Sequence, residues 1–140
     1  MAGIYVHIPF CRRKCYYCDF YKTTTLQKKG LFLEALNREV ALHKDYLKSE
    51  TIETVYLGGG TPSVLSVGEV KAILMQLEEN FNIDPGAEIT LETNPDDLHP
   101  AYFPGLHQAG VNRLSIGIQS FSDHDLQKMN RRHTAAQAIR

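Results

Sequence analysis

Apolar and polar positions alternate along this chain with two different periods. Short runs rich in β-branched and aromatic residues are typical of strands, and they cover 3–8, 54–57, 89–92 and 113–118. Between them, apolar residues recur at steps of three and four, which predicts helices. The predicted helices cover 31–48, a stretch that begins at Ser66, 97–108, 122–129 and a stretch that begins at Thr134.

Local signals mark the ends of several predicted helices. Ser66 and Glu69 form a capping box, in which each side chain accepts a hydrogen bond from a backbone N–H of the other residue. Gly110 is expected to end the helix over 97–108, and Pro104 is expected to interrupt it. The helix that follows Ser66 presents one apolar face, made of Val70, Ile73, Leu74, Leu77 and Phe81.

Strands that alternate with helices predict βαβ units and a parallel sheet. Right-handed crossovers leave two architectures open, a barrel-type arc and a doubly wound open sheet. Polar, glycine-rich or cysteine-rich segments follow the strands, at 11–18, 58–62, 92–95 and 119–121. Because the carboxyl ends of parallel strands share one rim, we expect these segments to build one site.

The last predicted helix is short. Thr134 and Gln137 form its capping box, and the chain ends after about two turns. The strand over 113–118 would then be an edge of the sheet, or would pair with a fifth strand. We therefore expect residues 1–140 to be the N-terminal portion of a larger domain.

Composition places the chain among globular proteins, because 43% of its residues are hydrophobic and 22% are charged. The net charge is −1 and the basic run at 12–14 lies between cysteines, so we expect no nucleic-acid-binding face. No apolar stretch approaches the roughly 20 residues that span a bilayer. The first residues also lack the pattern of a signal peptide, and we expect a reducing, cytoplasmic location.

The chain has three cysteines, Cys11, Cys15 and Cys18, with the spacing C-x3-C-x2-C. An odd number of closely spaced cysteines argues against a disulfide framework and favours metal binding or redox chemistry. Three thiolates can hold three irons of a [4Fe–4S] cluster and leave the fourth iron open to an exogenous ligand. The amino and carboxylate groups of a methionine moiety suit that position, and the basic run can offset the negative charge.

Two other interpretations of the cysteines stay open on the residues alone. A zinc ion could be held by the three cysteines and a histidine, of which His7 is the nearest. Zinc sites usually combine two separated cysteine pairs, and this sequence has no second pair. Alternatively, the cysteines could be small buried hydrophobic residues, although basic and aromatic residues surround them.

Three motifs connect the sequence to a known family. They are Tyr-Val-His-Ile-Pro-Phe-Cys over 5–11, Gly-Gly-Gly-Thr-Pro-Ser over 58–63 and Ile-Gly-Ile-Gln-Ser-Phe over 116–121. Together they resemble the branch of the radical S-adenosylmethionine (SAM) superfamily that contains oxygen-independent coproporphyrinogen III oxidase and the HemW-type haem chaperones. The resemblance covers essentially the whole chain. It implies an α/β fold, the first four βα units of a partial (β/α) barrel, with further barrel units and a C-terminal domain beyond residue 140.

The resemblance also implies which residues bind cofactors. The three cysteines would hold the [4Fe–4S] cluster. Glu92 would accept hydrogen bonds from the ribose of SAM, and the guanidinium of Arg131 would pair with a carboxylate. The residues implied in the SAM site are Tyr5, Tyr17, Gly59, Gly60, Thr61, Glu92, Gln119 and Arg131. A tight turn at the glycines and solvated strand ends at Glu92 and Gln119 are alternatives that the residues alone leave open.

Phe20 separates two functions within this branch. The porphyrinogen oxidases carry a further cysteine two residues after the third, where this chain has Phe20. Phenylalanine can neither ligate a metal nor carry a proton, so the resemblance favours a haem chaperone, with the oxidase as the alternative. The expected partners are haem or a porphyrinogen, a reductant protein and, for a chaperone, a client protein that accepts haem.

Overall fold

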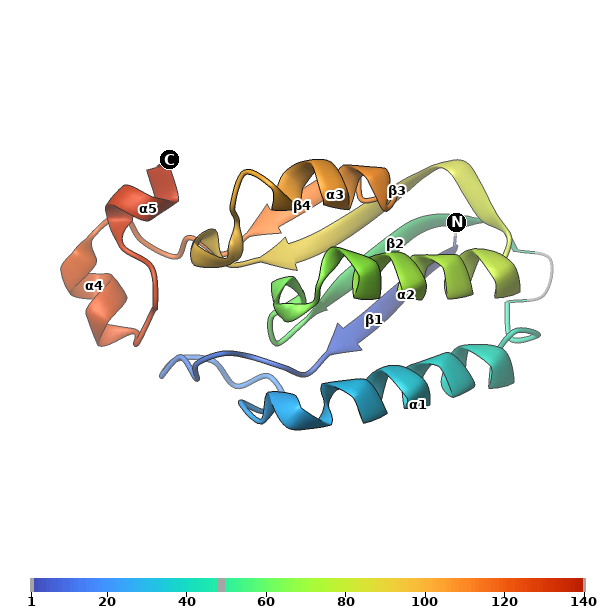
Figure 1. The fold of residues 1–140 in the computed structure, drawn as a ribbon, viewed down its shortest axis with the longest axis horizontal. Coiled ribbons are helices and arrows are strands. Elements are labelled where there is room, and N and C mark those ends of the chain that lie inside the picture. The colour runs from blue at the N-terminus through green and yellow to red at the C-terminus, as the bar shows by residue number, and fades with distance from the viewer. Residues whose placement is uncertain (1, 48–49, 140) are drawn as a thin grey trace.

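The computed structural model describes residues 2–47 and 50–139, which form a parallel β-sheet covered by helices (Figure 1). Its strands are β1 (Ala2–Ile8), β2 (Ile52–Gly59), β3 (Ile83–Thr93) and β4 (Arg113–Ile116). The strands pair in parallel in the order β1-β2-β3-β4. A doubly wound sheet reverses its strand order at a switch point, so the consecutive order identifies the barrel-type arc, which is open.

Helices connect the strands and cover one face of the sheet (Figure 1). α1 (Lys29–Leu42) contacts α2 (Val67–Asn80), and α2 contacts α3 (Tyr102–Gln108). α4 (Asp123–Lys128) and α5 (Ala135–Ile139) lie beyond the carboxyl ends of the strands, at the left of Figure 1. Short 3₁₀ turns are η1 (Leu26–Lys28), η2 (Pro62–Val64) and η3 (Pro95–Asp97). Over the residues described, no helix combines the length and apolar character needed to cross a membrane.

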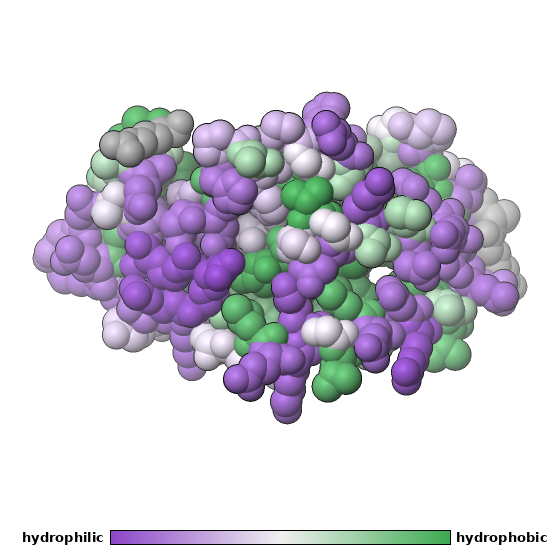
Figure 2. Space-filling model, viewed as in Figure 1, coloured by the Kyte–Doolittle hydropathy of each residue, from purple (hydrophilic) through white to green (hydrophobic). Residues whose placement is uncertain are grey.

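The hydrophobic core lies between these helices and the sheet. The predicted apolar face of α2 is buried there, and Phe81 packs against it while partly exposed. Alternating strand residues complete the core, namely Val6, Ile8, Val55, Leu57 and Leu91. The residues between them point to the opposite face, which therefore carries polar and aromatic side chains such as Tyr5, Tyr56 and Glu92. The outer surface of the helices is largely hydrophilic (Figure 2).

All four predicted strands form, although their bounds differ from the prediction. β1, β2 and β3 are longer than the predicted stretches, because the sheet pairs residues beyond those stretches, such as Ile52 with both Ala2 and Ile83. β4 ends at Ile116 rather than at residue 118. The N–H of Ile118 bonds to the carbonyl of Ile116 at 3.0 Å, so the backbone has already turned away from the sheet.

The helix predicted over 31–48 is displaced toward the N-terminus. It begins at Lys29 and ends at Leu42, with His43 as its C-terminal cap. Residues 43–46 are all exposed, so they offer no apolar face that would hold a further helical turn against the core. Position 48 of the prediction lies outside the described residues.

The helix predicted over 97–108 is wrong in its first half. The η3 turn ends at Asp97, and α3 begins only at Tyr102. Pro100 disfavours a helical conformation at the residue before it, which separates the turn from the helix. Pro104 does not interrupt α3, because it lies in the first turn, where no N–H donor is needed. Gly110 ends this segment as predicted, with a φ of +106°.

Both predicted capping boxes are present. The N–H of Glu69 bonds to Ser66 Oγ at 3.3 Å, and the N–H of Ser66 bonds to Glu69 Oε2 at 2.7 Å. The N–H of Gln137 bonds to Thr134 Oγ1 at 3.2 Å, and the N–H of Thr134 bonds to Gln137 Oε1 at 2.8 Å. These pairs fix the first turns of α2 and α5.

Candidate functional site

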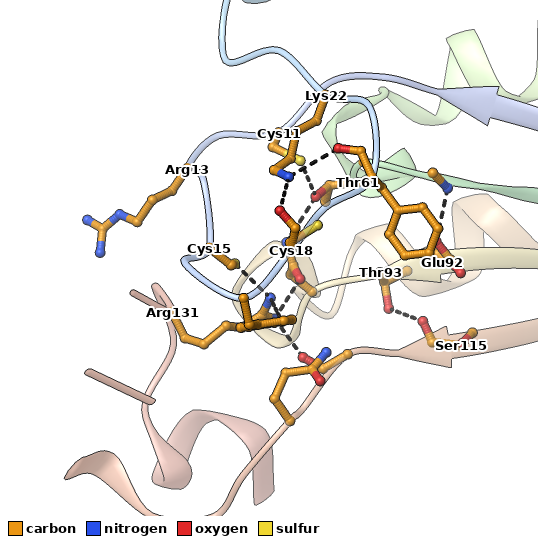
Figure 3. A pocket seen from close by; sticks show the side chains of 17 residues that line it. Cys11, Arg13, Cys15, Cys18, Lys22, Thr61, Glu92, Thr93, Ser115 and Arg131 are labelled. Carbon is orange, nitrogen blue, oxygen red and sulfur yellow. Dashed lines mark hydrogen bonds between the residues drawn. The ribbon is translucent and has the colours of Figure 1, made fainter. Parts of the chain in front are cut away.

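The segments that follow the four strands meet around one cavity with a volume of about 250 Å³ (Figure 3). This arrangement places the carboxyl ends of the strands at a common rim, as the pattern predicts. The predicted site residues that line the cavity are Cys11, Cys15, Tyr17, Cys18, Gly59, Gly60, Thr61, Glu92, Gln119 and Arg131. The structure therefore brings together residues from segments far apart in sequence.

The backbone of the cysteine loop is held in place by hydrogen bonds on both sides. Cys11 donates its N–H to the carbonyl of Thr23 at 2.9 Å, and Thr23 donates its N–H to Pro9 at 2.7 Å. On the far side, Asn130 Nδ2 donates to the carbonyl of Lys14 at 2.8 Å. The three cysteines are free thiols, of which Cys11 is buried.

Two of the thiols accept hydrogen bonds from side chains. Thr61 Oγ1 donates to Cys11 Sγ at 3.4 Å, and Arg131 Nη1 donates to Cys15 Sγ at 3.4 Å. Burial raises the pKa of the Cys11 thiol, and the hydrogen bond from Thr61 opposes this rise. Cys18 lines the same cavity and is only partly buried, whereas Cys11 is buried.

The arrangement of the thiols bears on the kind of metal they would bind. Within residues 2–47 and 50–139, no three His, Cys, Asp or Glu side chains are grouped closely enough to share one metal ion. A [4Fe–4S] cluster distributes its thiolates over separate irons, so it does not need that convergence. Soft thiolates beside the cationic Arg131 are a donor set that suits such a cluster.

The basic run at 12–14 is only partly directed at the cavity. Arg12 pairs with Asp97, whose side chain is only 4% exposed, at 3.2 Å between Nε and Oδ1. Arg13 lines the cavity but extends away from its centre (Figure 3). Lys22, which the sequence did not single out, donates from Nζ to the carbonyl of Cys18 at 2.6 Å. Arg131 and Lys22 therefore contact the cysteine loop directly, Arg131 at the sulfur of Cys15 and Lys22 at the carbonyl of Cys18.

Glu92 is fixed through both of its carboxylate oxygens. Tyr56 donates its hydroxyl to Oε1 at 2.7 Å, and Gly59 donates its N–H to Oε2 at 3.1 Å. Gly59 has a φ of +113°, which a residue with a side chain rarely adopts. A Cβ on Gly60 would lie 2.8 Å from the carbonyl oxygen of Phe10 and 3.0 Å from Cys11 Sγ. The glycine run is thus required by a positive φ and by close contact with the cysteine loop.

Arg131 spans the cavity wall. Its Nη2 donates to Asn94 Oδ1 at 2.7 Å and to the carbonyl of Gly117 at 2.6 Å, and its Nη1 reaches the hydroxyl of Tyr17 at 3.4 Å. Its Nε is buried without a hydrogen-bond partner among the described residues. Gln119 has a φ of +69°, which is uncommon for a residue with a side chain and occurs often at functional sites.

Tyr5 lies apart from the other predicted residues, in a neighbouring groove between β1 and α1. Its ring stacks on Tyr56, with centroids 6.0 Å apart, and Tyr56 in turn contacts Glu92. His7, the proposed zinc ligand, has partners at both ring nitrogens. Nδ1 lies 3.2 Å from the Tyr5 hydroxyl, and Nε2 lies 3.0 Å from the carbonyl oxygen of Tyr21.

Sequence reasoning missed several residues that line the cavity, namely Lys22, Thr93, Asn94, Ser115 and Gly117. Asn94 had a signal, because it lies within the strand-end segment 92–95. Gly117 had one too, since it belongs to the segment over 116–121. Lys22 and Ser115 belong to no motif, and only the folded chain brings them to the site.

Comparisons with known proteins agree with this geometry. A family model described as "Radical SAM superfamily" matches residues 5–140. "Heme chaperone HemW" of Haemophilus influenzae is 36% identical, over 97% of this chain and 37% of the relative. The protein of the same name from Lactococcus lactis is 40% identical, over 95% of this chain and 34% of the relative. The chain thus spans about a third of the length of these relatives.

A solved structure is also similar. It is coproporphyrinogen III oxidase (HemN) from Escherichia coli, described as a radical SAM enzyme, with a TM-score of 0.89 and 31% identity. The similarity covers 97% of this chain and 32% of the HemN chain. Radical SAM proteins use a [4Fe–4S] cluster and SAM, which the thiols and the polar side chains in the cavity wall fit. The match over residues 5–140 and the arc of parallel strands together show that the chain belongs to the radical SAM superfamily.

Proposed function

We propose that this chain binds a [4Fe–4S] cluster and SAM as part of a haem chaperone of the HemW type. The observation that carries the choice of chaperone is Phe20, which lines the cavity beside the three cysteines with 69% of its surface exposed. Relatives named as haem chaperones, 33–40% identical over most of the chain, support it.

Each residue of the cavity has a role that its chemistry supports. Cys11, Cys15 and Cys18 hold the cluster as thiolates. Together, the bound cluster and SAM supply one-electron reductive cleavage of the sulfonium. The chain itself binds and orients the cofactors and limits the access of water to the buried side of the cavity around Cys11.

The remaining residues bind SAM. Glu92, held by Tyr56 and Gly59, presents its free lone pairs to ribose hydroxyls. Backbone groups of the glycine run come close to the ligand because no Cβ intervenes. Arg131 has a buried Nε–H available as a donor to the carboxylate of SAM. Tyr17 and Gln119 complete the cavity wall, and Tyr5 acts at a distance through its stack on Tyr56.

Phe20 is the reason that we favour chaperone activity over oxidation of a porphyrinogen. A cysteine at this position could ligate a metal or transfer a proton or hydrogen atom, whereas the phenylalanine ring can only pack. The alternative function, oxidative decarboxylation of coproporphyrinogen III, is supported by the TM-score of 0.89 to HemN.

An anaerobic assay separates the two functions. The full-length protein is reduced in the presence of SAM and coproporphyrinogen III, and haem binding is followed separately by the Soret band. We expect haem binding without multiple turnovers to protoporphyrinogen IX. Repeated turnover would establish the oxidase, and Phe20→Cys serves as the matched variant that restores the missing thiol.

Metal analysis tests the proposed cluster. We expect about four irons per chain, with equivalent sulfide, after anaerobic reconstitution. Stoichiometric zinc without sulfide would instead support a zinc module. The engagement of both ring nitrogens of His7 argues against that module. We also propose a reductant protein, a haem-accepting client and a reducing cytosol, where free thiols persist as metal ligands.

A further inference from the structure

Two of the cysteine thiols accept a hydrogen bond from a side chain of another segment. Thr61, after β2, donates from Oγ1 to Cys11 Sγ, and Arg131, after α4, donates from Nη1 to Cys15 Sγ. Both contacts measure 3.4 Å. Two donors from distant segments therefore act on two ligands of one proposed cluster.

The side-chain amide of Asn94 joins these two donors. Its Oδ1 accepts from Nη2 of Arg131 at 2.7 Å, and its Nδ2 donates to Oγ1 of Thr61 at 3.3 Å. Asn94 directly follows β3 and lines the same cavity. It is thus a bridge between the two side chains that contact the thiols.

The chemistry of these groups fixes the orientation of the side-chain amide of Asn94. A guanidinium only donates, so the amide oxygen of Asn94 must face Arg131 and its NH₂ group must face Thr61. Thr61 then accepts at its oxygen, and its own O–H proton is left for the sulfur of Cys11. Asparagine supplies both the acceptor and the donor, whereas an aspartate carboxylate could only accept.

The surroundings hold Asn94 in this orientation. Its backbone N–H bonds to Ser63 Oγ at 3.3 Å, and Ser63 Oγ donates to Asp97 Oδ2 at 2.8 Å. Ser63 and Thr61 are only 5% and 6% exposed. Hydrogen bonds shielded from water in this way are stronger and polarise one another along a chain.

We propose that Asn94 is a positioning residue that sets the reduction potential of the cluster by directing hydrogen bonds onto Cys11 and Cys15. The inference rests on the cluster of the proposed function. Hydrogen bonds to the sulfur ligands stabilise the added negative charge of the reduced cluster, and they are among the factors that set its potential. Removing the amide of Asn94 therefore makes the cluster harder to reduce.

Asn94→Leu tests this inference, because leucine keeps the size of the side chain and removes both hydrogen bonds. Asn37→Leu, on the exposed surface of α1, is the matched control. The full-length protein is reconstituted anaerobically and titrated without SAM, and the reduced cluster is followed by electron paramagnetic resonance. We expect N94L to lower the ratio of reduced to oxidised cluster about tenfold at a fixed solution potential, equal to about 59 mV for one electron. We expect N37L to leave it unchanged.

A double-mutant cycle separates a positioning role from a merely structural one. Thr61→Val removes the hydroxyl that donates to Cys11, and we expect it to produce part of the same shift. Because Asn94 acts partly through Thr61, the shift of the double variant should be smaller than the sum of the two single shifts. If Asn94 were merely structural, its replacement would loosen the packing and reduce the cluster content, and the two shifts in potential would not be coupled.

An unchanged potential in N94L with its cluster intact would overturn the proposal. Asn94→Asp is the second variant, since it keeps the acceptor for Arg131 but cannot donate to Thr61. An unchanged potential in N94D, or loss of the cluster from both variants, would also overturn it. A wild-type protein that assembles no [4Fe–4S] cluster would instead overturn the proposed function.

Discussion

Tyr56→Phe is predicted to weaken the binding of SAM without disturbing the fold. The variant removes one hydroxyl, which lies 2.7 Å from Oε1 of Glu92. The ring itself keeps its stack on Tyr5. After the change, the N–H of Gly59 at 3.1 Å is the one hydrogen bond to Glu92 left among the described residues, and the carboxylate can rotate away from the ribose.

The expected magnitude follows from the strength of the lost contact. A hydrogen bond to a charged group contributes about 1.5–3 kcal/mol. Tyr56 is partly exposed and Gly59 keeps one oxygen of Glu92 in place, so the low end of this range applies. A loss of about 1.5 kcal/mol corresponds to a roughly tenfold increase in the Kd for SAM, since about 1.4 kcal/mol is a factor of ten.

The protonation state of Tyr56 gives the prediction a pH dependence. Burial, and then the hydrogen bond to Glu92, raise the pKa of the Tyr56 hydroxyl above its usual value near 10. The hydroxyl therefore remains a donor at neutral and mildly alkaline pH. The ratio of the two Kd values should be constant from about pH 7 to 9.

Equilibrium dialysis of SAM against the anaerobically reconstituted full-length protein measures this effect. Tyr46→Phe is the matched control, because Tyr46 is 80% exposed and lies after α1, away from the cavity. Equal or tighter binding by Y56F, with its thermal stability unchanged, would refute the reasoning. That result would mean that Tyr56 competes with the ribose for Glu92 instead of orienting it.

Three further outcomes are expected. Cys15→Ala leaves too few thiolates, so iron and sulfide content after reconstitution should fall to a small fraction of the wild-type value. Tyr102→Phe removes a buried bond of 2.8 Å to the carbonyl of Leu65 and should lower the free energy of unfolding by about 1–2 kcal/mol in urea titrations. Burial raises the pKa of Tyr102 to about 12. The contribution of Tyr102 to the stability of the fold is therefore present below about pH 10 and is lost as the pH rises toward about 12. The Y102F variant should lack this loss of stability at high pH. Residues 1–140 expressed alone should self-associate through the open edge of β4, and a monomeric, reversible unfolding transition would contradict this.

The sequence predicts the presence and order of the strands better than their length. β3 begins at Ile83, six residues before the predicted 89, although Asp84, Pro85 and Gly86 are typical of a turn. Ile83 pairs with Ile52, and the register then shifts before Thr54 pairs with Glu88. Residues 84–87 lie within that shift, and the N–H of Gly86 bonds to Asp84 Oδ1 at 2.7 Å, so the local turn signal is kept. The pairing of Ile83 with Ile52 extends the strand past this turn, and a single sequence does not contain that information.

The candidate site shows the same limit at the level of single side chains. The position of each segment at the rim follows from the order of strands and helices, which is why most predicted residues line one cavity. Because successive side chains of a strand point to opposite faces of the sheet, Tyr5 of β1 and Tyr56 of β2 lie on one face. The stacking of their rings was not predicted. Hydrogen bonds such as those of Asn94 join residues more than 30 positions apart, and neither periodicity nor motif spacing specifies them.

Asp97 explains how the segments of the rim keep a fixed geometry. Its side chain is 4% exposed, and a buried carboxylate is stable only when charged partners or donors satisfy it. Oδ1 lies 3.2 Å from Nε of Arg12 and 3.5 Å from Nη1 of Arg132, and Oδ2 accepts from Ser63 at 2.8 Å. One carboxylate at the end of η3 thus holds the cysteine loop, the segment after β2 and the segment after α4.

Each partner of Asp97 lies one or two positions after a proposed cofactor residue. The pairs are Cys11 with Arg12, Thr61 with Ser63, and Arg131 with Arg132. The first member of each pair lines the cofactor cavity, and the second lines another cavity together with Asp97. In each pair, therefore, one residue lines the cofactor cavity, and the other fixes the backbone of the same segment through its contact with Asp97. Arg12 and Arg132, which composition shows only as basic residues, neutralise the buried carboxylate and so determine where Cys11 and Arg131 lie.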